Sequence, residues 1–494
     1  MTHKKKLSLE QRESYRFSFV RLMITEQRPL GLLEKYQIAK LLTKCYGSVT
    51  ATALLRHNSP APCNDNQAIK NFYLNRLYPA VSRLVQKHPQ LTIIVLNADK
   101  PNAQFATLSS FNLADIVHVN CNVKFWDQAV INDIISAEVD KEFDTNIHTT
   151  PLWSLRIDTH PERSHECAIS FTLHHVIGDG KSLLIFWKEL LEQLKDGEMA
   201  DDNEYQIDIA EPRTIQPPQE YRNLVMPDEI KAPGTKEDEQ AMWQGDYEAI
   251  RDKKTQRHDT VVRTVVVNGD HWPKIVKTCK QHGVTPHAAL MVACALAFAE
   301  LYPDRVVRTM TPVNTRPLCD PPVPENEMGN FFGNFFRFWH PGFANDKSFW
   351  ELAIEYQAYV REGKGFAAAF AKNFFGHLKN FPEDFTDYWY SNWYKYPMGR
   401  AGGICVSDLG LISTKHVAST EWQLQEIFFN QSSHMYSIAL TVNAISTSSA
   451  MQACVAWQRN TLDISKADRY SSLVAKYLAQ CIDHDNQPSI SMSS

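Results

Sequence analysis

The residues whose types and spacing could do chemistry lie together in one turn, His174-His175-Val176-Ile177-Gly178-Asp179-Gly180. A neutral histidine can take a proton from an alcohol near neutral pH. Asp179 follows the histidines at a spacing that lets a tight turn fold its carboxylate back and brace their loop. A buried carboxylate is unfavourable without a cationic partner, so this interpretation requires a cation from elsewhere in the chain.

A strand and a helix are predicted to hold this turn from its two sides. Residues 166–175 alternate between apolar and polar, which is the period of a strand with one apolar face. Residues 183–194 repeat apolar side chains at the spacing of an amphipathic helix. A turn between two rigid elements is a good position for functional groups. The apolar positions are Cys167, Ile169, Phe171, Leu173, Leu183, Leu184, Trp187, Leu190, Leu191 and Leu194.

Other interpretations of the turn have to be weighed from the residues alone. The two histidines could equally be ordinary core residues. A metal site is disfavoured, because adjacent histidines on a strand point to opposite faces and chelate one ion poorly. A phosphate-binding loop would need glycine at position 175, which is histidine. The chain also contains neither the Gly-x-Ser-x-Gly elbow of a serine hydrolase nor a dinucleotide-binding Gly-x-Gly-x-x-Gly after a strand.

Composition limits the class of protein. A chain of 494 residues predicts two or three domains, and its net charge of −5 argues against a nucleic-acid carrier. Ten cysteines without a Cys-x-x-Cys pair indicate reduced, buried thiols in a cytoplasmic protein. No run of eighteen apolar residues predicts a transmembrane helix. The basic segment 1–23 is interpreted as a solvated tail, although an amphipathic helix in peripheral contact with a membrane stays open.

The order of predicted elements suggests two α/β lobes. Residues 1–200 and 241–494 both mix helices and strands, whereas residues 201–240 are rich in acidic residues and prolines and are interpreted as a linker or surface crossing. Near the C-terminus, residues 402–411, 426–433, 437–447 and 450–458 are predicted to be strands of one sheet.

The pattern His-His-x-x-x-Asp-Gly between a strand and a helix resembles the active-site motif of the chloramphenicol-acetyltransferase-like superfamily. That superfamily includes plant BAHD acyltransferases, condensation domains of nonribosomal peptide synthetases and fungal alcohol O-acetyltransferases. The chain is most similar to the fungal alcohol acetyltransferases over nearly its whole length, and it lacks the plant-type Asp-Phe-Gly-Trp-Gly motif. The further matching segments are RPLGLLEKYQIAK, PLWSLRI, GVTPHAALMVACALAF, VNTRPL with MGNFFGNFF, and VSDLG.

The resemblance implies an α/β fold of two lobes, each a mixed β-sheet flanked by helices, with the active site in a channel between them. It implies that His175 is the general base that deprotonates an acceptor hydroxyl for attack on an acyl-CoA thioester, without an acyl-enzyme. Asp179, the second catalytic residue of the motif, would act as a brace paired with Arg316. The product would be an ester and free CoA.

Supporting roles also follow from the resemblance. His174, Gly178 and Gly180 would support the motif, the two glycines by backbone freedom and by leaving room for substrate. The tetrahedral oxyanion needs a hydrogen-bond donor, and the CoA arm would run beside the Val-Ser-Asp-Leu-Gly strand, where Asp408 replaces the usual asparagine. The candidates for these two roles are Ser407, Asp408, Asn430, Gln431 and Ser432.

The expected substrates are an alcohol and acetyl-CoA or another short acyl-CoA, with no permanently bound cofactor, no metal and no nucleic acid. Aromatic residues crowd the stretch 331–395, which suggests an apolar acceptor such as a fatty alcohol, terpenoid or polyketide. A monomer is expected. The alternatives are a condensation-type enzyme that takes its acyl group from a carrier protein and an inactive homologue that acts as a binding protein. The absence of a carrier-like domain favours free CoA, and the intact His175 and Asp179 argue against an inactive homologue.

Overall fold

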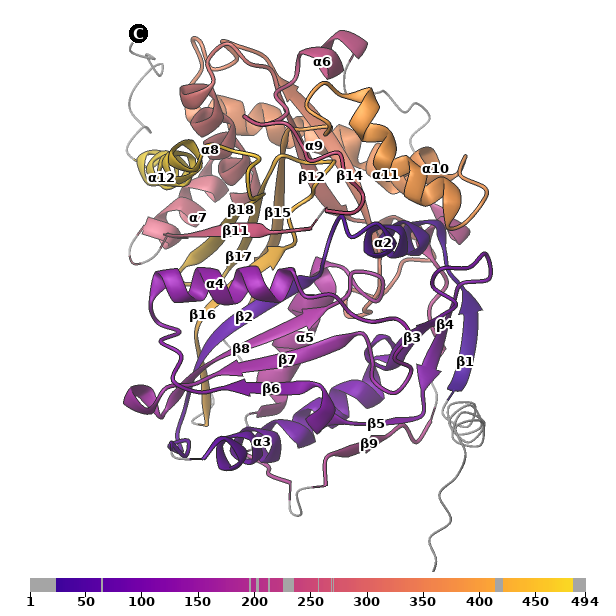
Figure 1. Cartoon of the computed structure of the whole chain (residues 1–494). Helices are drawn as coiled ribbons and strands as arrows, with labels where there is room; N and C mark the ends of the chain where they lie inside the picture. Colours follow the sequence, from indigo (N-terminus) through magenta and orange to yellow (C-terminus); the bar gives the residue numbers. More distant parts are fainter. Residues whose placement is uncertain are drawn as a thin grey trace, which may run out of the picture.

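The computed structural model describes residues 24–482 apart from 64, 195–196, 201–203, 212–213, 225–234, 256, 268, 270 and 414–420. The basic segment 1–23, considered above for membrane contact, lies outside the described residues. Two large sheets with helices packed against them form two lobes, one above the other in Figure 1. Each lobe has its own large apolar core.

The first lobe is built on a five-stranded sheet in the order β16-β2-β8-β7-β6. Strand β6 runs parallel to β7 and the other pairs are antiparallel, so the sheet is mixed. Its elements are β1 (Ile24–Pro29), α2 (Leu32–Leu42), β2 (Val49–His57), α3 (Asn66–Lys87), β3 (Ile93–Leu96), β4 (Gln104–Leu108), β5 (Ser110–Asn112), β6 (Val117–Asn120), α4 (Gln128–Val139), β7 (Trp153–Asp158), β8 (Glu166–Leu173) and α5 (Gly180–Gln193).

The second lobe is built on a six-stranded sheet in the order β11-β18-β17-β15-β12-β14. Strand β15 runs parallel to both β12 and β17, so this sheet is mixed as well. The chain from residue 260 onward contains β11 (Thr260–Val267), α7 (His271–Gln281), α8 (Pro286–Leu301), β12 (Val307–Asn314), β13 (Cys319–Asp320), β14 (Phe332–Trp339), α9 (Phe349–Ala368), α10 (Phe370–Phe375), α11 (Glu383–Lys395), β15 (Ile404–Leu411), β16 (Trp422–Gln431), β17 (Leu440–Ser446), β18 (Met451–Gln458) and α12 (Ile464–Gln480). Of these, β16 belongs to the sheet of the first lobe.

One strand crosses between the lobes, and the prediction of a single C-terminal sheet was wrong on this point. Strands β15, β17 and β18 do share a sheet, but β16 pairs antiparallel with β2 of the first lobe, from Trp422 opposite His57 to Gln431 opposite Val49. Strand pairing joins residues far apart in the sequence, and the apolar pattern of β16 suits either sheet. The described part of 201–240 holds only short elements, β9 (Gln206–Asp208), β10 (Asn223–Leu224) and the start of α6 (Lys236–Ala241).

Strand β8, which leads into the motif, is buried on both faces. Its apolar face packs against α5, where the rings of Phe171 and Phe186 stack with centroids 3.6 Å apart. Its polar face is also inaccessible, because Thr172 bonds to Thr50 across the strands and donates to Glu138 of α4. The turn after β8 is therefore held by elements that cannot shift independently.

Candidate active site

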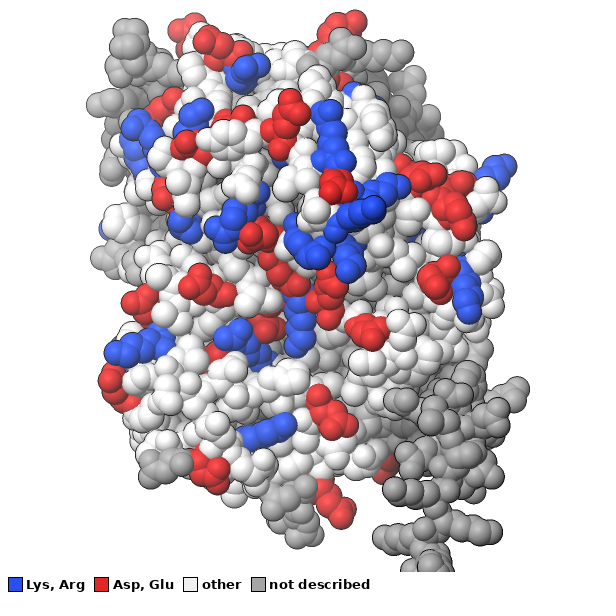
Figure 2. Space-filling view, in the orientation of Figure 1, with Lys and Arg blue, Asp and Glu red and all other residues white. Residues whose placement is uncertain are grey.

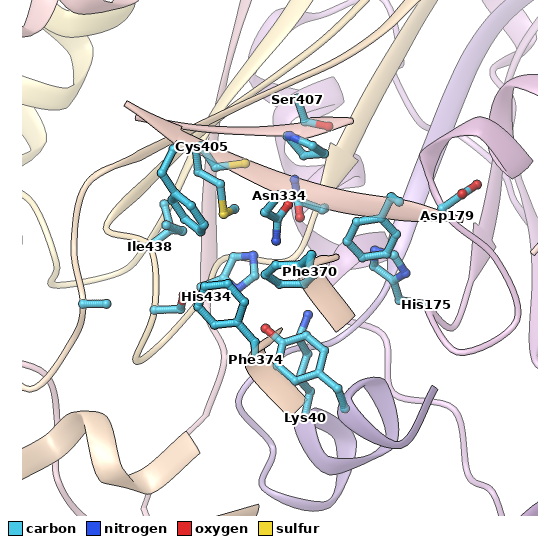
Figure 3. Close-up of a pocket in the computed structure, with 18 of the residues that line it drawn as sticks. Lys40, His175, Asp179, Asn334, Phe370, Phe374, Cys405, Ser407, His434 and Ile438 are labelled. Carbon is cyan, nitrogen blue, oxygen red and sulfur yellow. The ribbon is translucent and has the colours of Figure 1, made fainter. Parts of the chain in front are cut away.

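A cavity of about 350 Å³ lies where the motif turn of the first lobe meets β12, β14 and β15 of the second. His175, Asp179 and Gly180 line it from the turn. Helices α2, α10 and α11 close another side with aromatic side chains. Figure 3 shows His175 at one side of this space, Ser407 at another and Lys40 rising into it from α2. The aromatic lining residues are Tyr36, Phe332, Phe336, Phe370, Phe374, Phe375, Tyr388, Trp389, Tyr396 and Phe429.

The orientation of the His175 ring is set by Asn330, in the loop before β14. The amide nitrogen of Asn330 donates to the backbone carbonyls of His175 and Val176, at 2.8 and 2.7 Å. Its oxygen, Oδ1, must then be the atom 3.2 Å from Nδ1 of His175. Because an amide oxygen only accepts, Nδ1 carries the proton and Nε2 keeps its lone pair. Nε2 has no hydrogen-bond partner among the described residues.

Burial keeps both motif histidines neutral. It lowers the pKa of His175 to about 4, and the positive charge of Lys40 acts in the same direction. It lowers the pKa of His174 to about 3. The roles of the two rings differ: His174 is buried, does not line the cavity, and uses Nδ1 to accept from the backbone of Val176. His174 thus shapes the turn, and His175 faces the cavity.

Asp179 is turned away from the His175 ring and pairs with Arg316. The guanidinium donates from two nitrogens to the two carboxylate oxygens, at 2.9 and 3.1 Å, and Arg316 is fully buried. The same carboxylate accepts from the backbone of Phe331 and from the backbone and hydroxyl of Ser182, in the first turn of α5. Burial alone would raise the pKa of Asp179, but Arg316 and these donors hold it below its usual value. The predicted partner Arg316 is therefore in place.

Neither motif glycine has the positive φ that favours glycine, so the expectation that they give the loop conformational freedom was wrong. A Cβ on Gly178 would lie 2.8 Å from the Cβ of Ser182, and close packing against α5 explains this glycine. A Cβ on Gly180 would lie 2.5 Å from a methyl carbon of Leu409, which is the end of a flexible side chain and can rotate away.

The five oxyanion and CoA candidates separate into two groups. Ser407, Asp408 and Gln431 line the cavity. The Ser407 hydroxyl makes no hydrogen bond within the described part of the chain, so it is free to donate. Asn430 and Ser432 do not line the cavity and bond elsewhere, Asn430 to Asn443 and Ser432 to Asp140.

Asp408 has its own set of partners. One oxygen accepts from the backbone of Gly410 at 2.8 Å, and the other lies 3.7 Å from Nδ1 of His287 at the start of α8. His287 in turn lies within hydrogen-bonding distance of Tyr356. The Asp408 carboxylate thus lies beside a histidine of the same lobe.

Several residues in or beside the site were missed in the sequence. Asn330 stands inside the matching segment MGNFFGNFF, so the signal was present but its role was not assigned. Lys40 ends the matching segment RPLGLLEKYQIAK, and His434 follows the polar cluster 430–432. Neither has a local signal, because what distinguishes them is burial beside the cavity.

Lysine and arginine side chains are interspersed with acidic ones over the face seen in Figure 2. Among the described residues, no single helix is long and apolar enough to cross a membrane. Within the same residues, no group of three or more histidine, cysteine or acidic side chains could hold a metal ion.

Asp179→Asn should lower both stability and turnover, because it leaves the buried Arg316 without its counter-charge. Breaking a buried pair in this way costs about 3–5 kcal/mol. Denaturant unfolding and initial rates on the same preparation measure the two effects. Glu325→Gln is the control, since the Lys181–Glu325 pair is largely exposed and should change stability by less than about 1 kcal/mol. Loss of rate at unchanged stability would count against a bracing role for Asp179.

Relatives in sequence share one description. A family model described as alcohol acetyltransferase matches residues 30–472. The probable alcohol acetyltransferase crmB of Aspergillus fumigatus is 26% identical over 269 residues, which span 52% of this chain and 57% of that protein. The probable alcohol acetyltransferase FCK4 of Fusarium pseudograminearum is 22% identical over 432 residues, spanning 78% of this chain and 81% of that protein.

Solved structures share the fold. TRI3 trichothecene 15-O-acetyltransferase from Fusarium sporotrichioides aligns with a TM-score of 0.60 at 15% identity, over 92% of this chain and 95% of that one. The condensation domain of the Monacolin K polyketide synthase MokA aligns with a TM-score of 0.55 at 12% identity, over 95% and 99%. The fold is thus the two-lobed chloramphenicol-acetyltransferase-like one, as predicted. Because the family model spans most of the sequence, the chain belongs to the alcohol acetyltransferase family.

Proposed function

We propose that this protein transfers an acetyl or other short acyl group from acyl-CoA to the hydroxyl of an apolar alcohol, with His175 as the general base. The observation that carries the proposal is the hydrogen bonding of the His175 ring, which leaves Nε2 as a lone-pair nitrogen beside the cavity. Membership of the alcohol acetyltransferase family supports acyl transfer to an alcohol. The donor, the base and the acceptor class are the parts proposed here.

The proposed reaction moves one proton from the acceptor hydroxyl to His175 and then from His175 to the CoA sulfur. Nε2 of His175 accepts the proton of the acceptor hydroxyl while the hydroxyl oxygen bonds to the thioester carbonyl carbon. The tetrahedral intermediate then collapses, and its C–S bond breaks to give the ester. The departing CoA sulfur takes the proton from His175, which returns to its neutral form. No bond forms between the acyl group and the protein.

Ser407 is the proposed donor to the tetrahedral oxyanion. Its hydroxyl faces the cavity from β15 and has no partner among the described residues, so no internal bond has to break when a ligand oxygen arrives. A donor of this kind stabilises charge that appears only during the reaction. Asn430 and Ser432 are less suited, because neither lines the cavity.

The acceptor is proposed to bind along the aromatic wall made by α2, α10, α11 and β14. The ring of Tyr36 stacks on Phe375 and on Trp389, with centroids 4.3 and 5.1 Å apart. Such a surface favours an acceptor with an apolar or aromatic body. Part of the aromatic stretch 331–395 serves packing instead, since Phe349, Trp350 and Phe385 are buried away from the cavity.

His175→Ala should stop transfer, because no other group replaces Nε2. Loss of a general base lowers turnover about 10²- to 10⁴-fold. The assay incubates the protein with acetyl-CoA and primary alcohols of increasing chain length and follows free thiol and ester. His340→Ala, which alters an exposed histidine, is the control. Full activity in His175→Ala would refute the mechanism, and rates independent of acceptor hydrophobicity would refute the apolar acceptor.

The acid side of the pH profile should reflect the buried state of His175. Its pKa of about 4 means that the base stays neutral, and active, well below pH 6.5. Protonation removes the lone pair, so kcat/KM for a neutral alcohol should fall only as the pH approaches about 4. The measurement is kcat/KM over the pH range in which thermal unfolding shows the protein intact. A midpoint near 6.5 would show that the ring is not desolvated as described.

Ser407→Ala should reduce turnover more than it changes substrate binding, because the hydroxyl is proposed to act on the oxyanion. Removing one such donor lowers kcat about 10²- to 10³-fold. Steady-state kinetics separate kcat from KM. Ser432→Ala is the matched control, because Ser432 is a buried serine directly after β16 that does not line the cavity. Equal effects of the two variants would rule out a specific role for Ser407.

A further inference from the structure

Lys40 is a buried cation without a counter-charge. Its side chain extends from the last turn of α2, and the residue is 4% exposed. Among the described residues it makes no hydrogen bond and no ion pair, yet it lines the cavity beside His175. A buried ammonium without a partner destabilises the folded state by several kcal/mol, so its presence calls for another explanation than stability.

Aromatic faces hold the Lys40 ammonium in place without neutralising it. Its nitrogen, Nζ, lies 4.1 Å from the ring centre of Tyr46, 4.7 Å from that of Tyr36 and 5.6 Å from that of Trp389. Each ring attracts a cation through its quadrupole but carries no net charge. The positive field of the protonated amine therefore extends into the cavity. Burial lowers the pKa of Lys40 to about 7, so the amine without a ligand is about half protonated at pH 7, and a bound anion would keep the proton on it.

His434 provides a second unused polar group next to Lys40. It is 7% exposed, it lines the same cavity, and neither of its ring nitrogens has a partner among the described residues. Its ring lies 4.9 Å from that of Tyr46, the ring that also contacts Lys40. Burial lowers the pKa of His434 well below its ordinary value, so the ring is neutral and offers one N–H and one lone pair.

No carboxylate of the described residues forms an ion pair with Lys40. The acidic groups with the largest electrostatic effect on Lys40 are the thiols of Cys45 and Cys405, and burial raises the pKa of each to about 12, so both stay neutral. The carboxylate of Asp179 is already taken by Arg316. Asp408 and Glu239 also line the cavity, but neither is paired with Lys40 or His434. Among the described residues, the cation and the unpartnered imidazole thus face the cavity without an anionic partner.

We propose that Lys40 and His434 bind a carboxylate, or an oxygen of similar acidity, carried by the acceptor alcohol. One carboxylate oxygen would accept from the Lys40 ammonium and the other from the N–H of His434. The proposal rests on the proposed function and narrows its substrate to an apolar or aromatic hydroxy acid. It also assigns Lys40 and His434 to binding, with no covalent step.

The acceptor, rather than the acyl donor, is the expected source of the anion. Tyr36 and Trp389, which contact Lys40, belong to the aromatic wall assigned to the acceptor. Ser407, on the strand assigned to the CoA arm, lies across the cavity from Lys40 in Figure 3. An acetyl group carries no charge. A donor such as malonyl-CoA would, and it is therefore included in the test.

The test compares two acceptors that differ only in charge, 4-(hydroxymethyl)benzoate and its methyl ester. The quantity measured is the ratio of kcat/KM for the acid to that for the ester, with acetyl-CoA as donor. The wild-type protein should prefer the acid. Lys40→Met should lower the ratio roughly 10- to 100-fold, the effect of losing a charged hydrogen bond. Lys35→Met is the control, because Lys35 is on the same helix but does not line the cavity.

Further readouts separate binding from structure and from catalysis. Lys40→Met should not lower the melting temperature, because an apolar side chain replaces an unpaired buried charge. His434→Phe should lower the acid-to-ester ratio in the same direction. Calorimetric binding of the two probes to His175→Ala should show the same Lys40-dependent preference without turnover. If this preference is found while the wild type acetylates no alcohol, the proposed function fails and the present inference stands.

Three results would overturn the inference. An unchanged acid-to-ester ratio in Lys40→Met would show that no anion binds there. An equal loss of kcat with both probes would assign Lys40 to the oxyanion instead. A Lys40-dependent preference for malonyl-CoA over acetyl-CoA, with no preference between the two acceptors, would place the anion on the donor.

Discussion

The pairing of Asp179 with Arg316 is the interaction on which the rest of the site depends. Asp179 caps α5 in the first lobe, whereas Arg316 follows β12 in the second. The guanidinium also donates to the carbonyl of Gly329, and the carboxylate accepts from the backbone of Phe331. Asn330 lies between Gly329 and Phe331 in the chain. The ion pair therefore fixes the position from which the Asn330 amide reaches His175. The orientation of the His175 ring is therefore set by a contact between lobes.

Asp179 and Lys40 both line the cavity, but only Asp179 has hydrogen-bond partners for its charge among the described residues. Asp179 accepts five hydrogen bonds, two of them from a cation, and needs nothing from a ligand. Lys40 has only aromatic faces around its ammonium. A fully satisfied charge contributes to shape, whereas an unsatisfied one retains free energy that a ligand can recover. Asp179 therefore supports the structure of the site, whereas Lys40 is the charge that we propose binds a ligand.

Much of the site could be predicted from short segments. The alternation in β8, the turn and the helix period of α5 are local patterns, and the resemblance located Arg316 more than a hundred residues away. The rest depends on contacts that no local pattern encodes. The prediction assigned β16 to the wrong sheet, because its true partner β2 is far away in the sequence. In the sequence, Lys40 and His434 look like ordinary polar residues. Only the folded structure shows that both are buried beside one cavity.

The motif carboxylate is kept away from the imidazole for a chemical reason. A carboxylate bonded to Nδ1 would stabilise the protonated ring and raise its pKa. Here the partner of Nδ1 is the neutral amide of Asn330, and the pKa of His175 lies at about 4. Because the hydrogen-bonding capacity of Asp179 is taken up by Arg316, Ser182 and Phe331, it does not compete for that position. The His175 ring is thus neutral and held in one orientation, with the amide of Asn330 in place of a charged partner.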